Sequence, residues 1–460
     1  MKKQNKNTVS RREFVAGAVA GSLLAATTSL SQAPSVSRPN LLFILADDLG
    51  WGDLSCYGRP DYETPNLDRL AREGVRFTNA YSAAPVCTPT RCAFITGRYP
   101  ARTPVGLEEP ITWRKNLGAR LNTVGLPPEH PTIASLLKRN NYETALVGKW
   151  HLGYLPTFGP IQSGFDEFFG IMSGGVDYFT YKDAVGELDL FEDKVPVERI
   201  GYLTDLLTER AVGFISRRHT RPFYLSLHYT APHWPWEGPA DHEISAKLKL
   251  GNEGATSGGS VKTYAAMMKS LDDGIGRVMS ALKRAKLDRN TLVIFTSDNG
   301  GERFSYNWPF SGQKLSLREG GTRVPAIVRW PGTVPGGRKS EQVAVTMDWT
   351  ATLLSAAGAK ADPSYPMDGD DLISVVKGSQ SSYDRALFWR TRRQGAVRNG
   401  KWKYLREGDN EYLFDLSKDE REQADFKESN PDILKNLRKE FQKWESGVLQ
   451  YSKPNQEIRS

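Results

Sequence analysis

Four oxygen-bearing side chains stand out because they come at the ends of two strongly apolar segments. They are Asp47, Asp48, Asp298 and Asn299. The two segments, 40–46 and 291–296, have the continuous apolar pattern of buried strands. Carboxylate and amide oxygens suit a hard divalent cation such as calcium or magnesium, whereas zinc prefers His and Cys. Either pair alone is equally well explained as a turn that caps a strand. Convergence of both pairs would favour a metal site, because packed carboxylates without a cation repel one another.

Basic and imidazole side chains follow other apolar or glycine-rich segments. They are Lys149, His151, His233 and Lys314. Each alone is more often a surface lysine or a core histidine. Together, and next to a cation, they would form a pocket for a tetrahedral anion with a candidate general acid.

The segment 85–98 carries a cysteine in a chemically suggestive place. Cys87 stands two residues before Pro89, at a predicted helix start where backbone N–H groups favour an anion. Arg91 follows one helical turn later. The plain alternative is a turn with a buried thiol.

Apolar strands that alternate with helices must position these groups. Strands are predicted at 40–46, 144–147, 222–228 and 291–296. Helices are predicted to open at 64–68, with Thr64 as N-cap, and to span 131–139, 203–217 and 264–282. This alternation indicates a largely parallel sheet, in which sites form beyond the carboxyl ends of the strands. Polar groups far apart in the chain can therefore meet in one pocket.

The pattern changes after residue 378. Short strand candidates at 386–389, 395–398, 402–405 and 412–416 precede a helix at 431–444. Asn399-Gly400 is a hairpin signal between two of them. We therefore predict a large α/β domain at 39–378 and a small antiparallel-sheet subdomain at 379–460.

Residues 1–33 resemble an export signal. A basic start is followed by the short apolar run 14–26, and Ser10-Arg11-Arg12-Glu13-Phe14 resembles a twin-arginine motif. We expect export through the twin-arginine machinery to a periplasmic or secreted location in a bacterium, with 34–38 as a linker. An ordinary secretory signal is the alternative. The mean hydropathy of −0.49 argues against a multi-span membrane protein, and no stable membrane span is expected.

Charge and cysteine content narrow the classes further. Half of the net charge of +8 lies within residues 1–33, and no basic stripe is apparent in the rest, so no nucleic-acid partner is expected. Only three cysteines are present, so at most one disulfide is possible. We interpret Cys56 and Cys92 as buried thiols.

The segment around Cys87 resembles the signature of the sulfatase family, Cys-x-Pro-x-Arg followed four residues later by Thr-Gly. The matching residues are Cys87, Pro89, Arg91, Thr96 and Gly97. Four further blocks resemble the family in the same order, at 47–53, 64–68, 148–153 and 319–325. The branch looks most similar to arylsulfatase A and galactosamine-6-sulfatase.

This resemblance implies a fold and a set of ligands. The fold would be an alkaline-phosphatase-like α/β sandwich with a large, mostly parallel central sheet and a small C-terminal antiparallel subdomain. A separate maturation enzyme would oxidise Cys87 to Cα-formylglycine. The implied metal ligands are Asp47, Asp48, Asp298, Asn299 and the modified residue 87. Calcium is favoured as the metal, with magnesium as the alternative.

The resemblance also implies roles in hydrolysis of a sulfate ester. The hydrated aldehyde, a geminal diol, would attack sulfur while Arg91 holds it. Lys149 and Lys314 would neutralise sulfate charge, and His233 would protonate the leaving oxygen. His151 would assist removal of the second hydroxyl proton, after which sulfate leaves and the aldehyde returns.

Two other functions compete with a sulfatase acting on a sulfated small molecule or glycan. A phosphonate or phosphate ester hydrolase would use the same aldehyde and metal on phosphorus. A non-catalytic protein that binds sulfated glycans would keep the pocket without turnover.

Overall fold

The computed structural model describes residues 38–245 and 258–451. The predicted export signal 1–33 and all but the last residue of the predicted linker lie outside the described residues.

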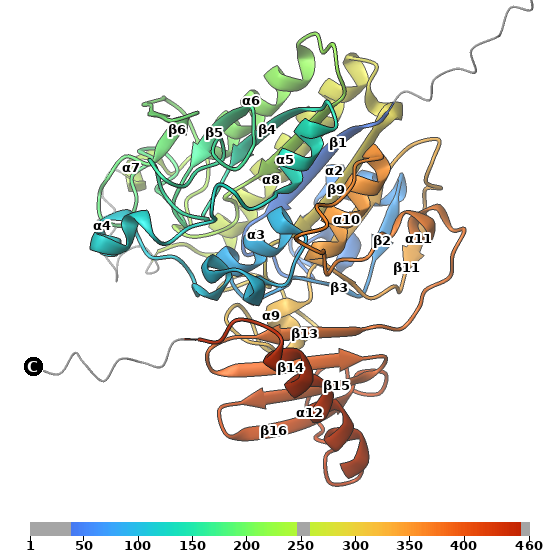
Figure 1. Ribbon diagram of the computed structural model, residues 1–460. Coiled ribbons are helices and arrows are strands. Elements are labelled where there is room, and N and C mark those ends of the chain that lie inside the picture. The colour runs from blue at the N-terminus through green and yellow to red at the C-terminus, as the bar shows by residue number, and fades with distance from the viewer. Residues whose placement is uncertain (1–37, 246–257, 452–460) are drawn as a thin grey trace, which may run out of the picture. The chain divides into compact units, whose positions relative to one another are not determined.

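A ten-stranded sheet forms the centre of this part of the chain (Figure 1). Its core strands are β1 (Asn40–Ala46), β8 (Phe223–His228), β4 (Glu143–Gly148), β5 (Glu167–Ile171) and β9 (Thr291–Ser297). β1 pairs in parallel with both β8 and β9, β4 pairs in parallel with β8, and β5 with β4. Every residue of β1, β8 and β9 is buried, as expected for strands covered on both faces.

Shorter strands extend the sheet at both edges. They are β10 (Ala326–Arg329), β2 (Val75–Phe77) and β11 (Arg338–Ser340) beyond β9, and β6 (Leu190–Glu192) and β7 (Val195–Pro196) beyond β5. β10 runs antiparallel to β9, so the sheet is mixed at this edge. β3 (Ala80–Tyr81) and β12 (Ala344–Val345) form a separate two-stranded sheet.

Helices pack on the two faces of the sheet as separate layers. One layer contains α3 (Cys87–Thr96), α5 (Ile133–Arg139) and α10 (Thr346–Ala357), and the other contains α2 (Pro65–Arg72), α6 (Leu203–Ser216) and α8 (Val261–Arg284). The side chains of β1 alternate between the layers: Leu41 and Phe43 join the first core, and Leu42 and Ile44 join the second. The two layers therefore bury the same strand from opposite sides.

Short helical turns connect these elements. They are η1 (Ser55–Tyr57), η2 (Pro100–Arg102), η3 (Pro104–Leu107), α4 (Arg114–Leu117), η4 (Gly118–Asn122), α7 (His242–Ser245), η5 (Asp288–Asn290), α9 (Glu319–Thr322) and α11 (Ile373–Lys377).

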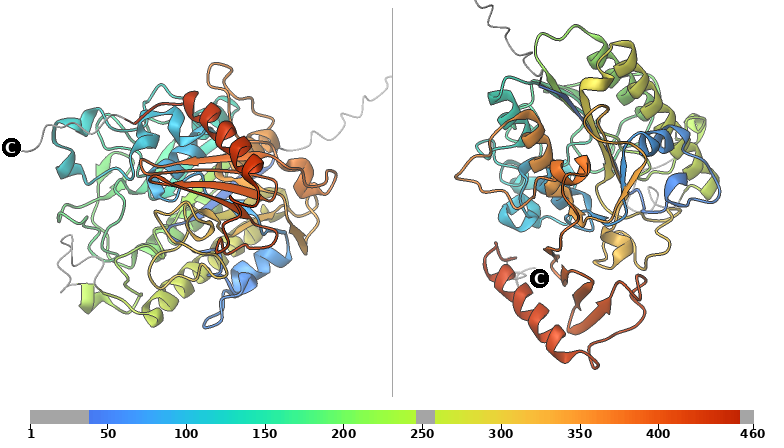
Figure 2. Two further views of the ribbon diagram at one scale, coloured as in Figure 1. Left: turned by 90° about the horizontal axis from the view of Figure 1, so that it is seen from below. Right: turned by 90° about the vertical axis from the view of Figure 1, so that its right-hand side faces the viewer.

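A four-stranded antiparallel sheet follows α11 in the chain (Figure 2). It consists of β13 (Ala386–Arg390), β14 (Gln394–Asn399), β15 (Trp402–Glu407) and β16 (Asn410–Asp415), in that order. α12 (Pro431–Ser446) packs on it, and a Cβ at Gly395 would lie 2.4 Å from the ring of Phe441. Gly395 thus lets the helix approach the sheet closely. The Asn399-Gly400 hairpin is confirmed, with Gly400 at φ +57°.

The predicted strands and helices are confirmed, with ends that differ by a few residues. The helix predicted at 264–282 begins earlier, because the Ser260 hydroxyl accepts a hydrogen bond from the Thr263 N–H at 3.0 Å and caps α8. Thr64 precedes α2 as predicted but does not cap it with its side chain. Its hydroxyl instead accepts a hydrogen bond from the Ser55 N–H at 3.0 Å.

All three cysteines are free thiols. Cys92 is buried as predicted, but the prediction for Cys56 is wrong, since that residue is only half-buried.

A buried ionic cluster joins the four-stranded sheet to the segment before β10. Lys403, on β15, lies 2.8 Å from a carboxylate oxygen of Glu319 and 2.8 Å from one of Glu422. Glu319 also accepts a hydrogen bond from the Tyr81 hydroxyl at 2.5 Å. Although burial opposes ionisation, the Lys403 and Arg323 charges lower the pKa of Glu319 to about 2. Lys403 therefore balances two carboxylates that have no access to water.

Replacing Lys403 by Met should destabilise the protein strongly. It leaves Glu422 buried without an ion-pair partner among the described residues and leaves Glu319 with Arg323 as its remaining ion pair. We expect a loss of about 3–5 kcal/mol in the free energy of unfolding. The exposed ion pair of Lys269 with Asp273 offers a control, since K269M should cost less than about 1 kcal/mol. Thermal and urea unfolding of both variants measures the difference, and equal effects would contradict the assignment.

Candidate active site

The carboxyl ends of three parallel strands bring several of the candidate residues together. β1 leads into Asp47, β9 into Asp298 and β4 into Lys149. The pairing of Ala46 with Ser297 places Asp298 beside Asp47, and the Asp298 N–H donates to the Ala46 carbonyl at 3.2 Å. Residues hundreds of positions apart therefore become neighbours through strand register.

Two residues with positive φ turn the chain sharply at these strand ends. Asp48 has φ +60°, and its N–H donates to Asp298 Oδ1 at 3.2 Å. Gly148 has φ +115°, and a Cβ there would lie 1.7 Å from the His228 carbonyl oxygen. Only glycine therefore fits at the end of β4.

Three carboxylates meet three cations in this buried region. Lys149 Nζ lies 2.5 Å from Asp47 Oδ2, and Lys314 Nζ lies 2.6 Å from Asp48 Oδ2. The third pair, Arg91 with Asp298, is joined by two hydrogen bonds of 2.8 and 3.1 Å to the same oxygen. The formal charges of the six side chains cancel.

The two aspartates Asp48 and Asp298 differ in electrostatic environment. Burial and the Asp47 charge raise the pKa of Asp298 to about 7, although Arg91 opposes the shift. For Asp48, burial is outweighed by neighbouring positive charge, chiefly that of Lys314, so its pKa falls well below the usual range. The protein thus keeps Asp48 ionised in the absence of any bound ion.

The oxygen donors of the region fit a divalent cation. Asp47 Oδ1 and Asn299 Oδ1 are buried and have no hydrogen-bond partner among the described residues. Asn299 instead uses its amide N–H groups, which donate to Asp48 Oδ1 at 2.7 Å and to the Gly300 carbonyl at 2.9 Å. Three residues of the region could each offer one ligand atom to a cation, namely Asp47, Asp48 and His233. These three atoms all lie within 4.8 Å of one another. Unsatisfied oxygens of this kind are what a hard cation would complete.

Cys87 is the first residue of α3, which confirms the predicted helix start. Its side chain is buried, and burial raises the pKa of the thiol although Lys149 and Lys314 oppose the shift. Arg91, one turn later, donates to the Lys149 carbonyl at 3.0 Å. The Thr88 hydroxyl donates to the His151 carbonyl at 3.2 Å. The first turn of α3 is therefore fastened to the end of β4.

The two predicted histidines occupy distinct positions. His233 Nε2 lies 3.7 Å from Asp48 Oδ2, and its Nδ1 lies 2.6 Å from the Trp234 carbonyl. His151 Nε2 lies 3.0 Å from the Ile111 carbonyl, and its Nδ1 is buried without a partner among the described residues. Burial and nearby lysine charges lower the pKa of both imidazoles, which favours their neutral forms.

Two adjacent glycines pack against these imidazoles. A Cβ at Gly174 would lie 2.7 Å from His151 Cε1, and one at Gly175 would lie 3.0 Å from His233 Cε1. A side chain at Gly174 would therefore displace the ring of His151, and one at Gly175 would crowd that of His233.

Sequence reasoning missed two side chains of this region. His228 Nδ1 lies 3.3 Å from Arg91 Nη1 and 3.1 Å from the Lys149 carbonyl. Its place as the last residue of a predicted apolar strand was a signal that could have found it. Glu302 lies 3.4 Å from Lys314 Nζ and has no comparable signal in the sequence.

A buried carboxyl group supports the loop that carries His233. The Tyr178 hydroxyl donates to the His233 carbonyl at 2.9 Å, and the Tyr178 N–H donates to Glu237 Oε2 at 3.1 Å. Glu237 Oε1 is buried without a partner among the described residues. Burial and the neighbouring Asp177 charge raise the pKa of Glu237 to about 8.

Comparison with known proteins places this geometry in context. Residues 39–359 match the family model "Sulfatase", and residues 312–446 match "N-sulphoglucosamine sulphohydrolase, C-terminal". The chain is 35% identical to N-acetylgalactosamine-6-sulfatase of Canis lupus familiaris, over 80% of this chain and 71% of the relative. It is 33% identical to steryl-sulfatase of Mus musculus, over 81% and 71% of the two chains.

A solved structure is similar to this chain over most of the length of both. Ps i-CgsB in complex with k-i-k-neocarrahexaose superimposes with a TM-score of 0.77 and 32% identity, covering 89% of this chain and 93% of that one. Together with the ten-stranded sheet, this likeness confirms the predicted alkaline-phosphatase-like α/β fold. Among the described helices, none is long and apolar enough to cross a membrane.

Replacing Glu237 by Gln should make stability less dependent on pH. Between about pH 4.5 and pH 8 the folded protein keeps a proton on Glu237 that the unfolded chain has lost, so the free energy of unfolding falls as pH rises. E237Q removes this penalty. The variant should therefore gain stability over the parent protein at pH 8 and not at pH 5.

Melting temperatures of both proteins at the two pH values test this. The exposed neighbour Glu243 supplies the control, because E243Q should shift the melting temperature equally at both. A constant offset in melting temperature between E237Q and the parent protein would refute the raised pKa of Glu237 as the cause.

Proposed function

We propose that this chain, which belongs to the sulfatase family of sulfuric ester hydrolases, removes sulfate from a sulfate ester. It would do so through Cys87 matured to formylglycine. The observation that carries the proposal is the place of Cys87. Cys87 is the first residue of α3 and lies beside the charge-balanced group of three carboxylates and three cations. The charges of Lys149 and Lys314 act on its thiol. A nucleophile there would face cations that attract a sulfate group.

Charge balance explains how the pocket would accept an anion. When bound, a divalent cation would polarise the sulfate oxygens, and the hydrated formylglycine would supply the attacking hydroxyl. The ligands of the cation would be Asp47, Asp48, Asp298, Asn299 and the modified residue 87. Because the three ion pairs are neutral in sum and Glu302 adds one carboxylate, a divalent cation would give the site a surplus positive charge. Lys149 and Lys314 would then bind the sulfate oxygens.

The histidines and Arg91 would handle protons and orientation. His233 lies on the side of Lys314 and Asp48 and would protonate the leaving oxygen. A bound sulfate would counteract the lysine charges that now lower the pKa of His233, and so favour the protonated imidazole. His151 would take the second hydroxyl proton. Arg91, fixed by Asp298 and the Lys149 carbonyl, would orient residue 87.

Two of the three similar proteins named above favour a sulfated carbohydrate as the substrate. The relative from Canis lupus familiaris is named for N-acetylgalactosamine 6-sulfate, and the solved structure holds k-i-k-neocarrahexaose. The relative from Mus musculus is instead named for a steryl sulfate. We infer a sulfated carbohydrate as the substrate class of this chain.

Export and domain division remain part of the proposal. We propose that the protein is bacterial and periplasmic or secreted, that the twin-arginine machinery exports it, and that a maturation enzyme acts on Cys87 first. We keep the boundaries 39–378 and 379–460 for the catalytic domain and the C-terminal subdomain.

The mass of the proteolytic peptide that contains Cys87 tests the mechanism. Protein produced together with a formylglycine-generating enzyme should carry an aldehyde at residue 87, while Cys92 in the same helix stays a thiol. C87A should lower turnover of 4-nitrophenyl sulfate by about 10³-fold or more. An unmodified thiol in active protein would refute the mechanism. Faster turnover of the matched phenyl phosphonate ester would instead favour the phosphorus hydrolase.

Adding calcium or magnesium to EDTA-treated protein should raise its melting temperature. A cation at 100 times its Kd stabilises the folded state by about 2.7 kcal/mol. D47N should lose this response, since it removes an anionic ligand, whereas the surface variant D273N should keep it. The larger response would identify the preferred metal. An unchanged response in D47N would contradict the assigned ligands.

A further inference from the structure

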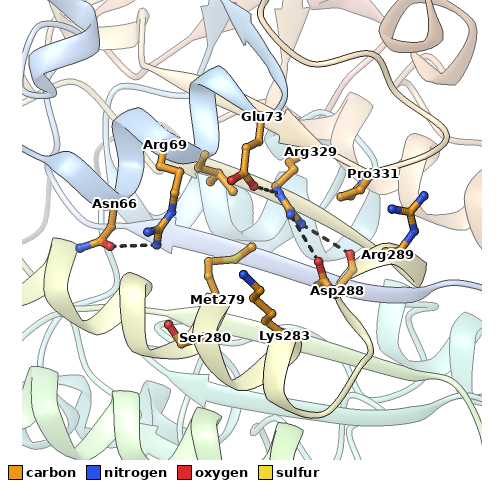
Figure 3. Close-up of a pocket in the computed structure, with 11 residues that line it drawn as sticks. Asn66, Arg69, Glu73, Met279, Ser280, Lys283, Asp288, Arg289, Arg329 and Pro331 are labelled. Carbon is orange, nitrogen blue, oxygen red and sulfur yellow. Dashed lines mark hydrogen bonds and ion pairs between the residues drawn. The ribbon is translucent and has the colours of Figure 1, made fainter.

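A basic hollow lies away from the candidate active site (Figure 3). Its volume is about 490 Å³, and it is bordered by α2, the end of α8, η5 and the end of β10. Four cations line it: Arg69, Lys283, Arg289 and Arg329. Its two acids are Glu73 and Asp288.

One cation of the hollow, Arg329, already forms ion pairs with both of its acids. Arg329 lies 2.7 Å from Glu73 and 3.7 Å from Asp288. Lys283 and Arg289 have no carboxylate within 4.0 Å among the described residues. Arg69 has none either, and it donates only to the Asn66 amide oxygen, at 3.0 Å. The hollow therefore presents exposed positive charge that the described part of the chain does not neutralise.

Helix dipoles account for part of this arrangement. Arg69 lies in the last turn of α2 and Lys283 in the last turn of α8, where cations are favoured. The dipoles do not explain why both turns border one hollow. Figure 3 shows the ends of Arg69 and Lys283 extending into the same space.

Two adjoining hollows extend the positive charge. One, of about 660 Å³, shares Asn66, Arg69 and Ser280 with the first and adds Arg284, Arg277 and the acid Asp273. Arg277 is already paired with Asp205 and Glu209, at 3.4 and 3.5 Å. The other, of about 290 Å³, also borders α2 and contains Arg72, Arg76, Arg338 and Lys339. We use the name basic face for five exposed cations, four from the first two hollows and Arg72, that have no carboxylate within 4.0 Å among the described residues. They are Arg69, Arg72, Lys283, Arg284 and Arg289. Because they come from separate segments, no basic stripe is visible in the sequence.

The basic face lies at the opposite end of the sheet from the catalytic residues. Arg329 pairs with Val293 near the start of β9, whereas Asp298 follows the end of that strand. A strand of seven residues spans about 20 Å. A ligand on the basic face therefore cannot be the ester that reacts at Cys87.

We propose that the basic face binds sulfate groups of a sulfated polysaccharide chain, apart from the reacting ester. This rests on the proposed function for the identity of the polymer. Five cations without a paired carboxylate, spread over adjoining hollows, suit an extended polyanion better than one small anion. None of the residues that line the three hollows is aromatic, so they lack the platforms on which nucleic-acid bases stack.

Binding of dextran sulfate, measured without turnover, tests the proposal. R69Q/K283Q should weaken binding about tenfold, and the slope of log affinity against log salt should fall by about two. The control K435Q/K439Q removes the same charge from exposed positions on α12 and should change affinity less than about twofold. Turnover of 4-nitrophenyl sulfate should stay unchanged in both variants, which separates this test from that of the catalytic proposal.

Equal losses in the two variants, or no loss in R69Q/K283Q, would overturn the basic face as the binding site. Single-stranded DNA serves as a second polyanion. DNA binding as tight as that of dextran sulfate, and equally lost in R69Q/K283Q, would overturn the assignment to a sulfated polysaccharide. Equal melting temperatures of both variants and the parent protein establish that folding is intact.

Discussion

Burial of three carboxylates at the ends of parallel strands is the constraint on which the rest of this structure depends. Asp47, Asp48 and Asp298 would repel one another in a region without water, and each is held by a cation from a different element. Lys149 comes from the end of β4 and Arg91 from α3. Strand order, the turn at Gly148 and the position of α3 must all be correct at once for the charges to cancel.

The same principle appears a second time, where the small sheet meets the large domain. Lys403 is buried between Glu319 and Glu422, and Glu319 begins the turn whose Gly321 carbonyl accepts a hydrogen bond from the Gly300 N–H at 3.0 Å. Gly300 follows Asn299 directly. The C-terminal sheet therefore contributes to the position of a candidate metal ligand without contacting it.

Much of the fold and the site could be predicted from the sequence because strand ends are easy to recognise. Continuous apolar runs located β1 and β9, and the polar residues after them are the ones that meet. Other features depend on contacts that no local pattern encodes. Thr64 is a residue type that often caps a helix, but its hydroxyl accepts a hydrogen bond from the Ser55 N–H instead of capping α2. The support of His233 by Glu237 passes through Tyr178, nearly 60 positions away. The basic face forms only because the fold brings α2, the end of α8 and η5 together.

The burial of Cys87 within the first turn of α3 has a consequence for how the enzyme population is made. A side chain that is 2% exposed and held in a helix is closed to another enzyme once the protein has folded. Formylglycine formation and folding would therefore compete in time, and each molecule would be committed once. Chains that fold first would remain stable, correctly shaped and inert. The specific activity of a preparation would then depend on the ratio between the rate of formylglycine formation and the rate of folding during synthesis. It would not report a property of the folded site.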